Sequence, residues 1–222
     1  PVTDIYFSAG PMDVLDHSCS KLGFGGKMCI DGTMKFDEER DDNIQFTNNF
    51  SAIRDKAFWS QFPAIRSVNT SLLQKHIPCI IVSVEKDRRG HINTLHQQIT
   101  ALKELEAVRL ILYVEHTVDA NDLAVALWRF CNNLDPKRDS HLVQRASISL
   151  PGKQYACMGL DGTRKTKEHD DFQRDWPNII VADEATITAV DKKWDDLGIG
   201  AFIPSPSLKF KDQQYGLEAV VN

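Results

Sequence analysis

The most crowded group of reactive side chains in this sequence lies in the segment DVLDHSCS, residues 13–20. It places Asp16, His17, Ser18 and Cys19 in a row, and these are the residue types of a nucleophile, a general base and an orienting acid. Catalytic triads, however, are assembled from distant segments rather than from neighbours along the chain. We therefore interpret this segment as a turn rich in capping residues and assign no catalytic residue to it.

Two histidines and one strand end are weaker candidates for metal or ligand binding. His91 and His96 are five residues apart, so they do not share a helix face as ligands four residues apart would, and the sequence has no HExxH pattern. The segment EHTVD, residues 115–119, follows an apolar run and is expected at the carboxyl end of a strand, where ligand contacts are common. A helix cap followed by a loop explains the same residues, and we favour that reading. No metal ligand is assigned.

Phosphate-binding loops are the next chemistry to test, because ligands of parallel sheets sit beside helix N-termini. The turn EKDRRGH, residues 85–91, has one glycine where a dinucleotide fingerprint needs three. The segment GFGGK, residues 23–27, lacks the spacing and the Ser or Thr of a P-loop. We interpret the short basic cluster KDRRG, residues 86–90, as a solvated turn.

Composition limits the function classes. The chain has 222 residues, of which 42% are hydrophobic, and a formal net charge of −5, which is typical of a globular protein and argues against nucleic-acid binding. No apolar run approaches the roughly 20 residues of a membrane span, and no signal peptide is recognisable. The five cysteines show no CxxC spacing, which favours reduced thiols and a cytoplasmic location. Because the chain begins with Pro, we expect either processing or a fragment.

The elements that must position any site are clearest between residues 79 and 150. Two continuous apolar runs, 79–84 and 109–114, are typical of central strands covered on both faces. The segment between them predicts a helix whose apolar stripe consists of Ile92, Leu95, Ile99, Leu102 and Leu105. Such a crossover joins parallel strands with right-handed sense.

A second helix is predicted between Asp119 and Pro136. Asp119 is the expected N-cap, and Asp122 adds a second carboxylate near the positive end of the helix dipole. The expected buried face consists of Leu123, Leu127, Phe130 and Cys131, and Trp128 is expected to pack in the core beside it.

Two further elements complete the expected fold. Residues 141–150 alternate weakly and would add a strand, while residues 183–198 predict a last helix with Asp183 as N-cap and Gly198 just past its end. The fold class expected is α/β, a layered and mostly parallel sheet flanked by helices.

One phrase occurs twice. MCIDGTMK at 28–35 and MGLDGTRK at 158–165 share five residues at the same places, 130 residues apart. Solenoid and propeller repeats have periods of roughly 20 to 50 residues, so this interval favours a duplicated whole domain.

Several ordered motifs carry a family resemblance. The segment RLILYVEHTVDANDLAVALWRFCNNLDPKRDS, followed by CMGLDGTRKTKE and RDWP, resembles the C-terminal domain of the UbiD family of decarboxylases over about residues 58–198. The segment LDHSCSKLGFGGKMCIDGTMKFDEE, residues 15–39, resembles the closing part of the same domain. The resemblance implies four regions: the tail of a first unit at 1–40, a linker at 41–56, a complete unit at 57–200 and a C-terminal tail at 201–222.

The resemblance also implies an activity. UbiD-type enzymes are carboxy-lyases that remove CO2 from an aromatic or α,β-unsaturated acid, as in quinone biosynthesis, using prenylated flavin mononucleotide (FMN), a divalent metal and potassium. Their catalytic residues lie in an upstream domain that no stretch of this chain resembles. We therefore expect this chain to be inactive alone, to bind no cofactor, and to serve oligomerisation and closure of an active site.

One residue is a candidate for cofactor contact. Some members of the family contact the cofactor with a Lys just before the second strand of the C-terminal domain, and Lys103 is the nearest counterpart here. A solvent-facing helix lysine is the favoured alternative.

The expected partners are the upstream catalytic domain of the same protein and further copies of the chain in a homo-oligomer. The rival hypotheses are a self-contained binding or assembly module with the same fold and a small nucleotide-binding protein. A reading frame that continues for several hundred codons upstream of Pro1 would favour the decarboxylase, whereas a start codon at Pro1 would favour the module.

Overall fold

The computed structural model describes residues 4–34, 36–39 and 50–214. The chain divides between Arg174 and Asp175 into two compact units. Among the described residues, no helix is both long enough and apolar enough to cross a bilayer. The region predicted as a linker is partly outside this set, since residues 40–49 are not described and short helices begin at Ser51.

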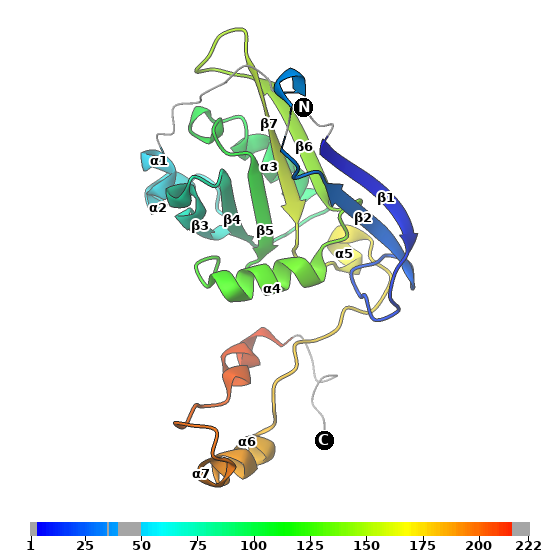
Figure 1. The fold of residues 1–222 in the computed structure, drawn as a ribbon, viewed down its shortest axis with the longest axis vertical. Coiled ribbons are helices and arrows are strands. Elements are labelled where there is room, and N and C mark those ends of the chain that lie inside the picture. The colour runs from blue at the N-terminus through cyan, green and yellow to red at the C-terminus, as the bar shows by residue number, and fades with distance from the viewer. Residues whose placement is uncertain (1–3, 35, 40–49, 215–222) are drawn as a thin grey trace. The chain divides into compact units, whose positions relative to one another are not determined.

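The first unit is built on a five-stranded sheet with the order β3-β4-β5-β7-β6 (Figure 1). The three central strands are parallel, and both edge strands are antiparallel to their neighbours. The expected α/β class is confirmed, with a mixed sheet whose parallel part is its centre. The strands are β3 (Ile65–Asn69), β4 (Cys79–Val84), β5 (Leu110–Glu115), β6 (Ser140–Ala146) and β7 (Gln154–Asp161).

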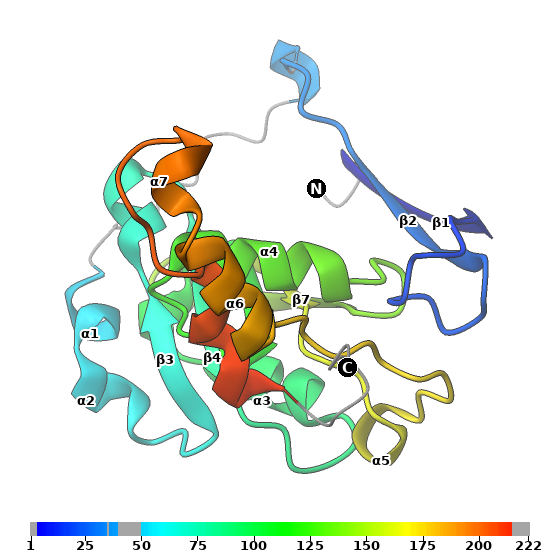
Figure 2. The same ribbon diagram turned by 90° about the horizontal axis from the view of Figure 1, so that it is seen from below.

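Helices cover both faces of this sheet. Side chains alternate between the faces along each strand, so Ile80, Val82 and Val84 share one core with α3 (His91–Ile99), α1 (Ser51–Arg54) and α2 (Lys56–Trp59). The helix α4 (Leu123–Asn133) lies on the opposite side of the sheet from α3 (Figure 2). The predicted apolar stripe of α3 is confirmed at Ile92, Leu95 and Ile99, which are at most 3% exposed.

The prediction for α4 was wrong in its cap and in its buried face. Its N-cap is Asp122, whose carboxylate accepts a hydrogen bond from the Val125 amide at 3.2 Å, whereas Asp119 binds the Asn121 amide in the preceding loop. Val118 and Ala120 are buried in the loop between β5 and α4. The helix therefore begins only after this loop, at Leu123.

Of the apolar residues expected on the buried face of α4, Phe130 is buried as predicted, but most of the others are exposed. Leu127 is 38% exposed, Trp128 is 43% exposed, and Cys131 is exposed. The buried face consists of Val125, Ala126, Arg129, Phe130 and Asn133. It includes two polar residues because these reach a buried glutamate at the end of β5, a partner that the apolar pattern could not reveal.

The second unit contains α6 (Glu184–Asp191), α7 (Trp194–Leu197) and a 3-10 helix at Pro206–Gln213. Asp183 is the N-cap of α6 as predicted, and its carboxylate accepts a hydrogen bond from the Thr186 amide at 2.8 Å. Gly198 ends α7 with a φ of 63°, a left-handed conformation that suits glycine. The predicted helix is therefore confirmed, with a break at residues 192–193.

The first repeated phrase belongs to a separate hairpin of β1 (Ile5–Pro11) and β2 (Phe24–Ile30). We call Asp4–Thr33 the first hairpin and Asp139–Thr163, which contains β6 and β7, the second hairpin. The two strands pair with each other in antiparallel fashion, and among the described residues they form a sheet of their own.

The two hairpins share backbone and side-chain bonds at matching positions. The Asp31 amide donates to the Asp4 carbonyl at 2.8 Å, and the Asp161 amide donates to the Asp139 carbonyl at 2.9 Å. The Thr33 amide donates to the Asp31 carboxylate at 2.9 Å. In the second hairpin, the Thr163 amide makes the same bond to Asp161 at 2.9 Å. The two copies of the repeated phrase therefore form the same local turn.

The first hairpin packs on the corner that precedes β6. The Gly26 amide donates to the Asp135 carboxylate at 3.1 Å, and the Arg138 guanidinium donates to the Ser18 carbonyl at 2.6 Å. A Cβ at Gly26 would lie 2.0 Å from the Asp135 Oδ1, so this close approach requires glycine.

Candidate functional site

A pocket of about 260 Å³ lies where the parallel strands end. Because β4, β5 and β7 are parallel, their carboxyl ends meet at one edge of the sheet, the usual place for ligands in such folds. The pocket is lined by the turn after β4, the start of β6, the end of β7 and α5 (Lys167–Asp170). Its basic side chains are Lys86, Arg88, Arg89, Arg138 and Lys165.

The turn after β4 brings the first of these groups to the pocket. Gly90 adopts a φ of 67°, and this left-handed residue lets the chain turn directly into α3 at His91. The basic cluster at residues 86–90 was predicted to be a solvated turn, and this holds for only some of its side chains. Arg88 and Arg89 have exposed side chains, whereas the Lys86 side chain is only 8% exposed.

Lys86 is held by the last residue of α5 and by a backbone carbonyl of the segment that precedes it. Its ammonium group donates to the Asp170 carboxylate at 2.7 and 2.8 Å and to the Arg164 carbonyl at 2.8 Å. Burial lowers the pKa of Lys86, and the carboxylates of Asp161 and Asp170 oppose this shift. The side chain therefore connects the end of β4 to α5 as one arm of a buried ion network.

A second buried ion group forms the floor of the pocket. The Lys165 ammonium donates to the carbonyls of Asp161 and Thr163 at 2.7 and 2.8 Å. It also lies 3.2 Å from the Asp161 carboxylate and 3.6 Å from the Asp139 carboxylate. Arg138 in turn makes a two-pronged ion pair with Asp139, with both bonds at 2.7 Å.

The two aspartates of this floor differ in their proton affinity. Burial would raise the pKa of Asp161, but the charges of Lys165 and Lys86 and the hydrogen bonds from Thr163 lower it to about 2. Burial raises the pKa of Asp139 in spite of Lys165 and Arg138. Asp161 is therefore a carboxylate at neutral pH.

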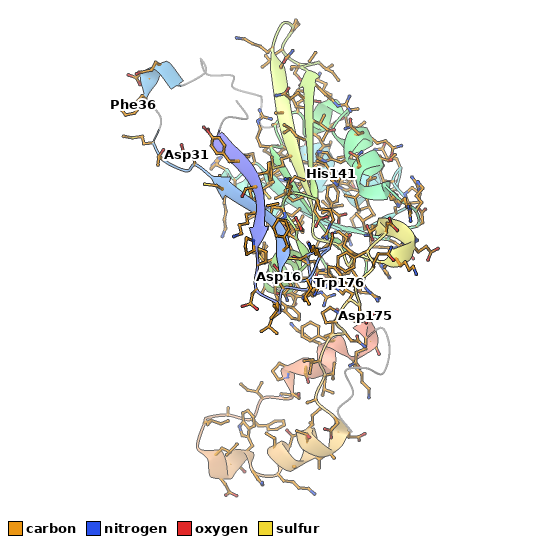
Figure 3. All side chains as sticks on the ribbon, turned by 90° about the vertical axis from the view of Figure 1, so that its right-hand side faces the viewer. Asp16, Asp31, Phe36, His141, Asp175 and Trp176 are labelled. Atoms are coloured by element: carbon orange, nitrogen blue, oxygen red, sulfur yellow. The ribbon has the colours of Figure 1, made fainter. Side chains whose placement is uncertain are left out.

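Two histidines of the pocket wall are neutral at pH 7. Burial lowers the pKa of His91 and of His141, and in both cases the nearby aspartates only partly oppose the shift. His141 lies at the start of β6 (Figure 3). Neutral imidazoles both donate and accept hydrogen bonds, so this wall offers polar groups without adding charge.

A separate network of buried polar side chains connects the end of β5 to α4. Glu115, the last residue of β5, is buried and pairs with the Arg129 guanidinium of α4, with the Arg129 Nε at 2.9 Å from its carboxylate. The Asn133 side chain donates to the same carboxylate at 3.1 Å and to the Gly162 carbonyl at 3.0 Å. In the segment 115–119, the glutamate therefore makes contacts within the protein, which agrees with the interpretation of this segment as a structural one.

The other sequence candidates lie outside the pocket. Asp16 lies in the loop that joins β1 and β2 (Figure 3), and its carboxylate accepts hydrogen bonds from the Ser18 amide at 2.9 Å and hydroxyl at 2.7 Å. This is the capped turn that the sequence predicts. His96 is buried against Tyr113, with its Nδ1 2.9 Å from the hydroxyl. Lys103 is exposed on a 3-10 turn that precedes β5, and it does not line the pocket.

Sequence reasoning missed the pocket residues although two signals were present. Asp161 and Lys165 are part of the repeated phrase, and Lys86 follows the carboxyl end of a buried strand. Their meeting depends on long-range folding, since Lys86 and Asp170 are 84 residues apart.

The pocket can bind a small polar molecule, but it does not show a catalytic set. Each of its buried ammonium groups already has carboxylate partners, so an incoming anion would share them rather than find a free charge. Within residues 4–34, 36–39 and 50–214, no three His, Cys, Asp or Glu side chains are grouped to hold a metal ion.

Comparison with known proteins places this domain in a family. Residues 51–154 match the profile of the 3-octaprenyl-4-hydroxybenzoate carboxy-lyase C-terminal domain. An uncharacterised protein of Aeropyrum pernix is 24% identical over 150 residues, which is 62% of this chain and 31% of that protein. The chain thus spans about a third of the length of this relative.

Solved structures of decarboxylases also align with the chain. The vanillic acid decarboxylase of Sedimentibacter hydroxybenzoicus in its closed form aligns with 64% of this chain and 30% of its own, at 15% identity and a TM-score of 0.46. The UbiD-class enzyme HmfF of Pelotomaculum thermopropionicum, in complex with prenylated FMN, aligns with 54% of this chain and 24% of its own, at 18% identity and a TM-score of 0.37. On the evidence of the family profile, residues 51–154 form a C-terminal domain of the UbiD decarboxylase family.

Proposed function

We propose that this chain is the C-terminal region of a UbiD-type decarboxylase that acts on an aromatic or α,β-unsaturated acid, in the cytoplasm and in the setting of quinone biosynthesis. The match of residues 51–154 to the family profile carries the proposal. The chain spans 31% of the length of its Aeropyrum relative, which is consistent with a catalytic domain elsewhere in the polypeptide.

The cofactors of the family do not fit the described residues of this chain. The pocket of about 260 Å³ is smaller than the roughly 300–1,000 Å³ of typical ligand and cofactor sites, and its lysines are occupied by aspartates. Prenylated FMN, the divalent metal and potassium are therefore assigned to the upstream catalytic domain, and Lys103 is retained as a residue that could reach the cofactor from this side.

The role proposed for this region is oligomerisation and closure over the active site. The outer face of α4 supports it, since Leu127 and Trp128 expose apolar surface on a helix that is otherwise anchored to the sheet. Apolar side chains exposed next to each other on a rigid helix are typical of contact surfaces.

The first test asks whether this chain, without the upstream catalytic domain, retains flavin or releases CO2. The chain would be produced together with a source of prenylated FMN and purified, and its flavin absorbance and CO2 release from aromatic acids would be measured. We expect neither flavin retention nor turnover, because the groups that hold the cofactor and polarise the substrate lie elsewhere. Retained flavin or measurable CO2 release would refute the proposal.

The contact role needs a test in the whole decarboxylase. Trp128→Glu should shift the enzyme to a smaller assembly in light scattering, while Gln98→Glu, which adds the same single negative charge on the exposed face of α3, should leave the assembly unchanged. An unchanged mass for both variants would leave α4 without a contact role.

A stand-alone binding module is the second candidate, and the charged pocket favours it. It predicts that the chain alone binds a small anionic ligand with a measurable heat, which the first proposal does not require.

A further inference from the structure

The outer edge of β2 has hydrogen-bonding groups that β1 does not use. In an antiparallel pair, residues alternate between positions that bond to the partner strand and positions that point away from it. The bonds from the Asp31 amide to the Asp4 carbonyl and from the Met12 amide to the Gly23 carbonyl set this alternation. They direct the amides of Gly26, Met28 and Ile30 away from β1.

The part of this edge at Gly25 and Gly26 is already covered by the corner around Asp135. The Gly26 amide donates to the Asp135 carboxylate at 3.1 Å, and Gly25 and Gly26 are buried against that corner. Among the described residues, β1 is the one strand that pairs with β2. The part of the edge that remains for another strand is therefore the short stretch 28–31.

The second hairpin shows what lies at the matching edge. There, residues Met158–Asp161 of β7 pair in parallel with Leu110–Tyr113 of β5, and the Met158 amide donates to the Arg109 carbonyl at 2.9 Å. Met158 matches Met28 in the repeated phrase. Residues 158–161, which pair with β5 in the second hairpin, are thus the counterparts of residues 28–31 in the first, where the amides of Met28 and Ile30 point away from β1.

Burial separates the two edges in the same way. Leu160 is 4% exposed beside β5, whereas its counterpart Ile30 is 62% exposed. Met34 and Phe36, which follow the first turn, are 87% and 71% exposed. A strand and its covering helix at β2 would bury this apolar surface, as β5 and α4 do at β7.

We propose that residues 28–31 of β2 are a docking edge for one parallel, apolar strand of the kind of Leu110–Tyr113, supplied by the remainder of the first UbiD-type unit. The Asp135 corner limits the edge to four residues, which matches the length of the β5–β7 pairing. A second copy of this chain related by two-fold symmetry would pair β2 with β2 in antiparallel fashion, in conflict with the parallel pairing at the matching edge. Such a docking edge would follow from the duplicated fold and would not depend on decarboxylation.

Amide exchange in the chain itself is the first test. By NMR, the amides of Met28 and Ile30 should exchange at least about 100-fold faster than those of Met158 and Leu160, while the inward amide of Cys29 should be protected by β1. Equal protection of Met28 and Met158 in the monomeric chain would show that the edge is already occupied, and the proposal would fail.

A fusion protein provides the occupant for the second test. A second copy of residues 51–138 is placed directly before Asp4, because Asp4 is the counterpart of Asp139. The added copy contains β3, β4, β5 and α4 and would complete the first unit. Exchange at Met28 and Ile30 should then slow by about 100-fold, to the level of the second hairpin. If the added strands are protected while Met28 and Ile30 still exchange rapidly, the edge does not receive a strand.

Matched proline variants of the fusion protein identify the edge that is used. Phe7 and Met28 are opposite each other in the hairpin, and both amides point away from the partner strand. Met28→Pro removes an amide that the docked strand needs and should restore rapid exchange at Ile30. Phe7→Pro removes an amide on the other edge and should leave Ile30 protected. The opposite result would assign the docking edge to β1.

Discussion

The two hairpins have the same local bonds in two different environments. Each ends in an aspartate whose carboxylate accepts a hydrogen bond from the amide two residues later, at 2.9 Å in both cases. In the second hairpin Asp161 and Thr163 are buried, 6% and 0% exposed, whereas Thr33 in the first hairpin is exposed. The turn is therefore a local property of the sequence, and the ion network around it is not.

Glycine positions show the same contrast. A Cβ at Gly162 would lie 2.6 Å from the Phe130 ring and 3.1 Å from the Tyr113 carbonyl, while a Cβ at the matching Gly32 would meet nothing within 4 Å. One glycine of the repeated phrase is thus required by packing, and the other is not. Variants at matching positions of the two hairpins should therefore differ in cost.

The largest difference is expected at the two aspartates. Asp161→Ala removes a carboxylate that lies 3.2 Å from the Lys165 ammonium, a side chain that is 2% exposed. Breaking such a buried pair should lower the free energy of unfolding by about 3–5 kcal/mol. Asp31→Ala loses an exposed turn bond and should cost less than about 1 kcal/mol. Urea unfolding of both variants measures the difference, and equal costs would show that the buried network contributes little.

The second largest difference in the free energy of unfolding is expected between the matching glycines, Gly162 and Gly32. Gly162→Ala forces Phe130 away from β7 and should lower the free energy of unfolding by about 2–3 kcal/mol. Gly32→Ala should be neutral or stabilise the protein by about 0.5 kcal/mol, because it restricts the unfolded chain without a clash. Thermal unfolding of the two variants checks this order, and a Gly162→Ala protein as stable as the parent chain would contradict a close contact between residue 162 and Phe130.

A pH effect is expected in the second hairpin, where His96 packs against Gly159. Burial lowers the pKa of His96 to about 4, well below the ordinary 6.5. The unfolded state therefore binds the proton more tightly, and stability is present above pH 6.5 and is lost as the pH falls toward 4. The loss should reach about 2 kcal/mol at pH 5.

His96→Gln isolates this effect from the other histidines. The variant should be less stable than the parent chain at pH 7, and the gap should narrow by about 2 kcal/mol at pH 5, because glutamine does not titrate. A gap that is the same at both pH values would show that His96 keeps an ordinary pKa.

The smallest effect is expected at Trp128, on the opposite side of α4 from Phe130. The indole is 43% exposed and lies under the Arg129 guanidinium, 5.6 Å from its ring centre. Trp128→Ala should therefore cost about 1 kcal/mol rather than the cavity cost of a core residue. Phe130→Ala is the control and should cost about 3–5 kcal/mol in the same unfolding assay. If the two costs were equal, Trp128 would be a core residue as its sequence context suggested.

Prediction from sequence succeeded where the signal was local and strong. The apolar runs that became β4 and β5 are continuous and buried, and the stripe of α3 has an unmixed helical period. The caps of α6 and the turn at Asp16 depend on residues a few positions apart. Strands β3 and β7 escaped prediction because β3 is short and half polar, and β7 contains Gly159 and a mixture of small and large residues.

The sequence by itself determined the α/β class, the repeated strand-end turn and the family resemblance, because each depends on residues that are close together along the chain. The tertiary structure alone decided which face of α4 is buried. Arg129 and Asn133 face inward because both donate hydrogen bonds to the buried carboxylate of Glu115 at the end of β5. It also decided that Lys86, Asp139, Asp161 and Lys165 form one pocket. Charges separated by many residues become a site only when the sheet brings its strand ends together, and burial then sets their pKa values.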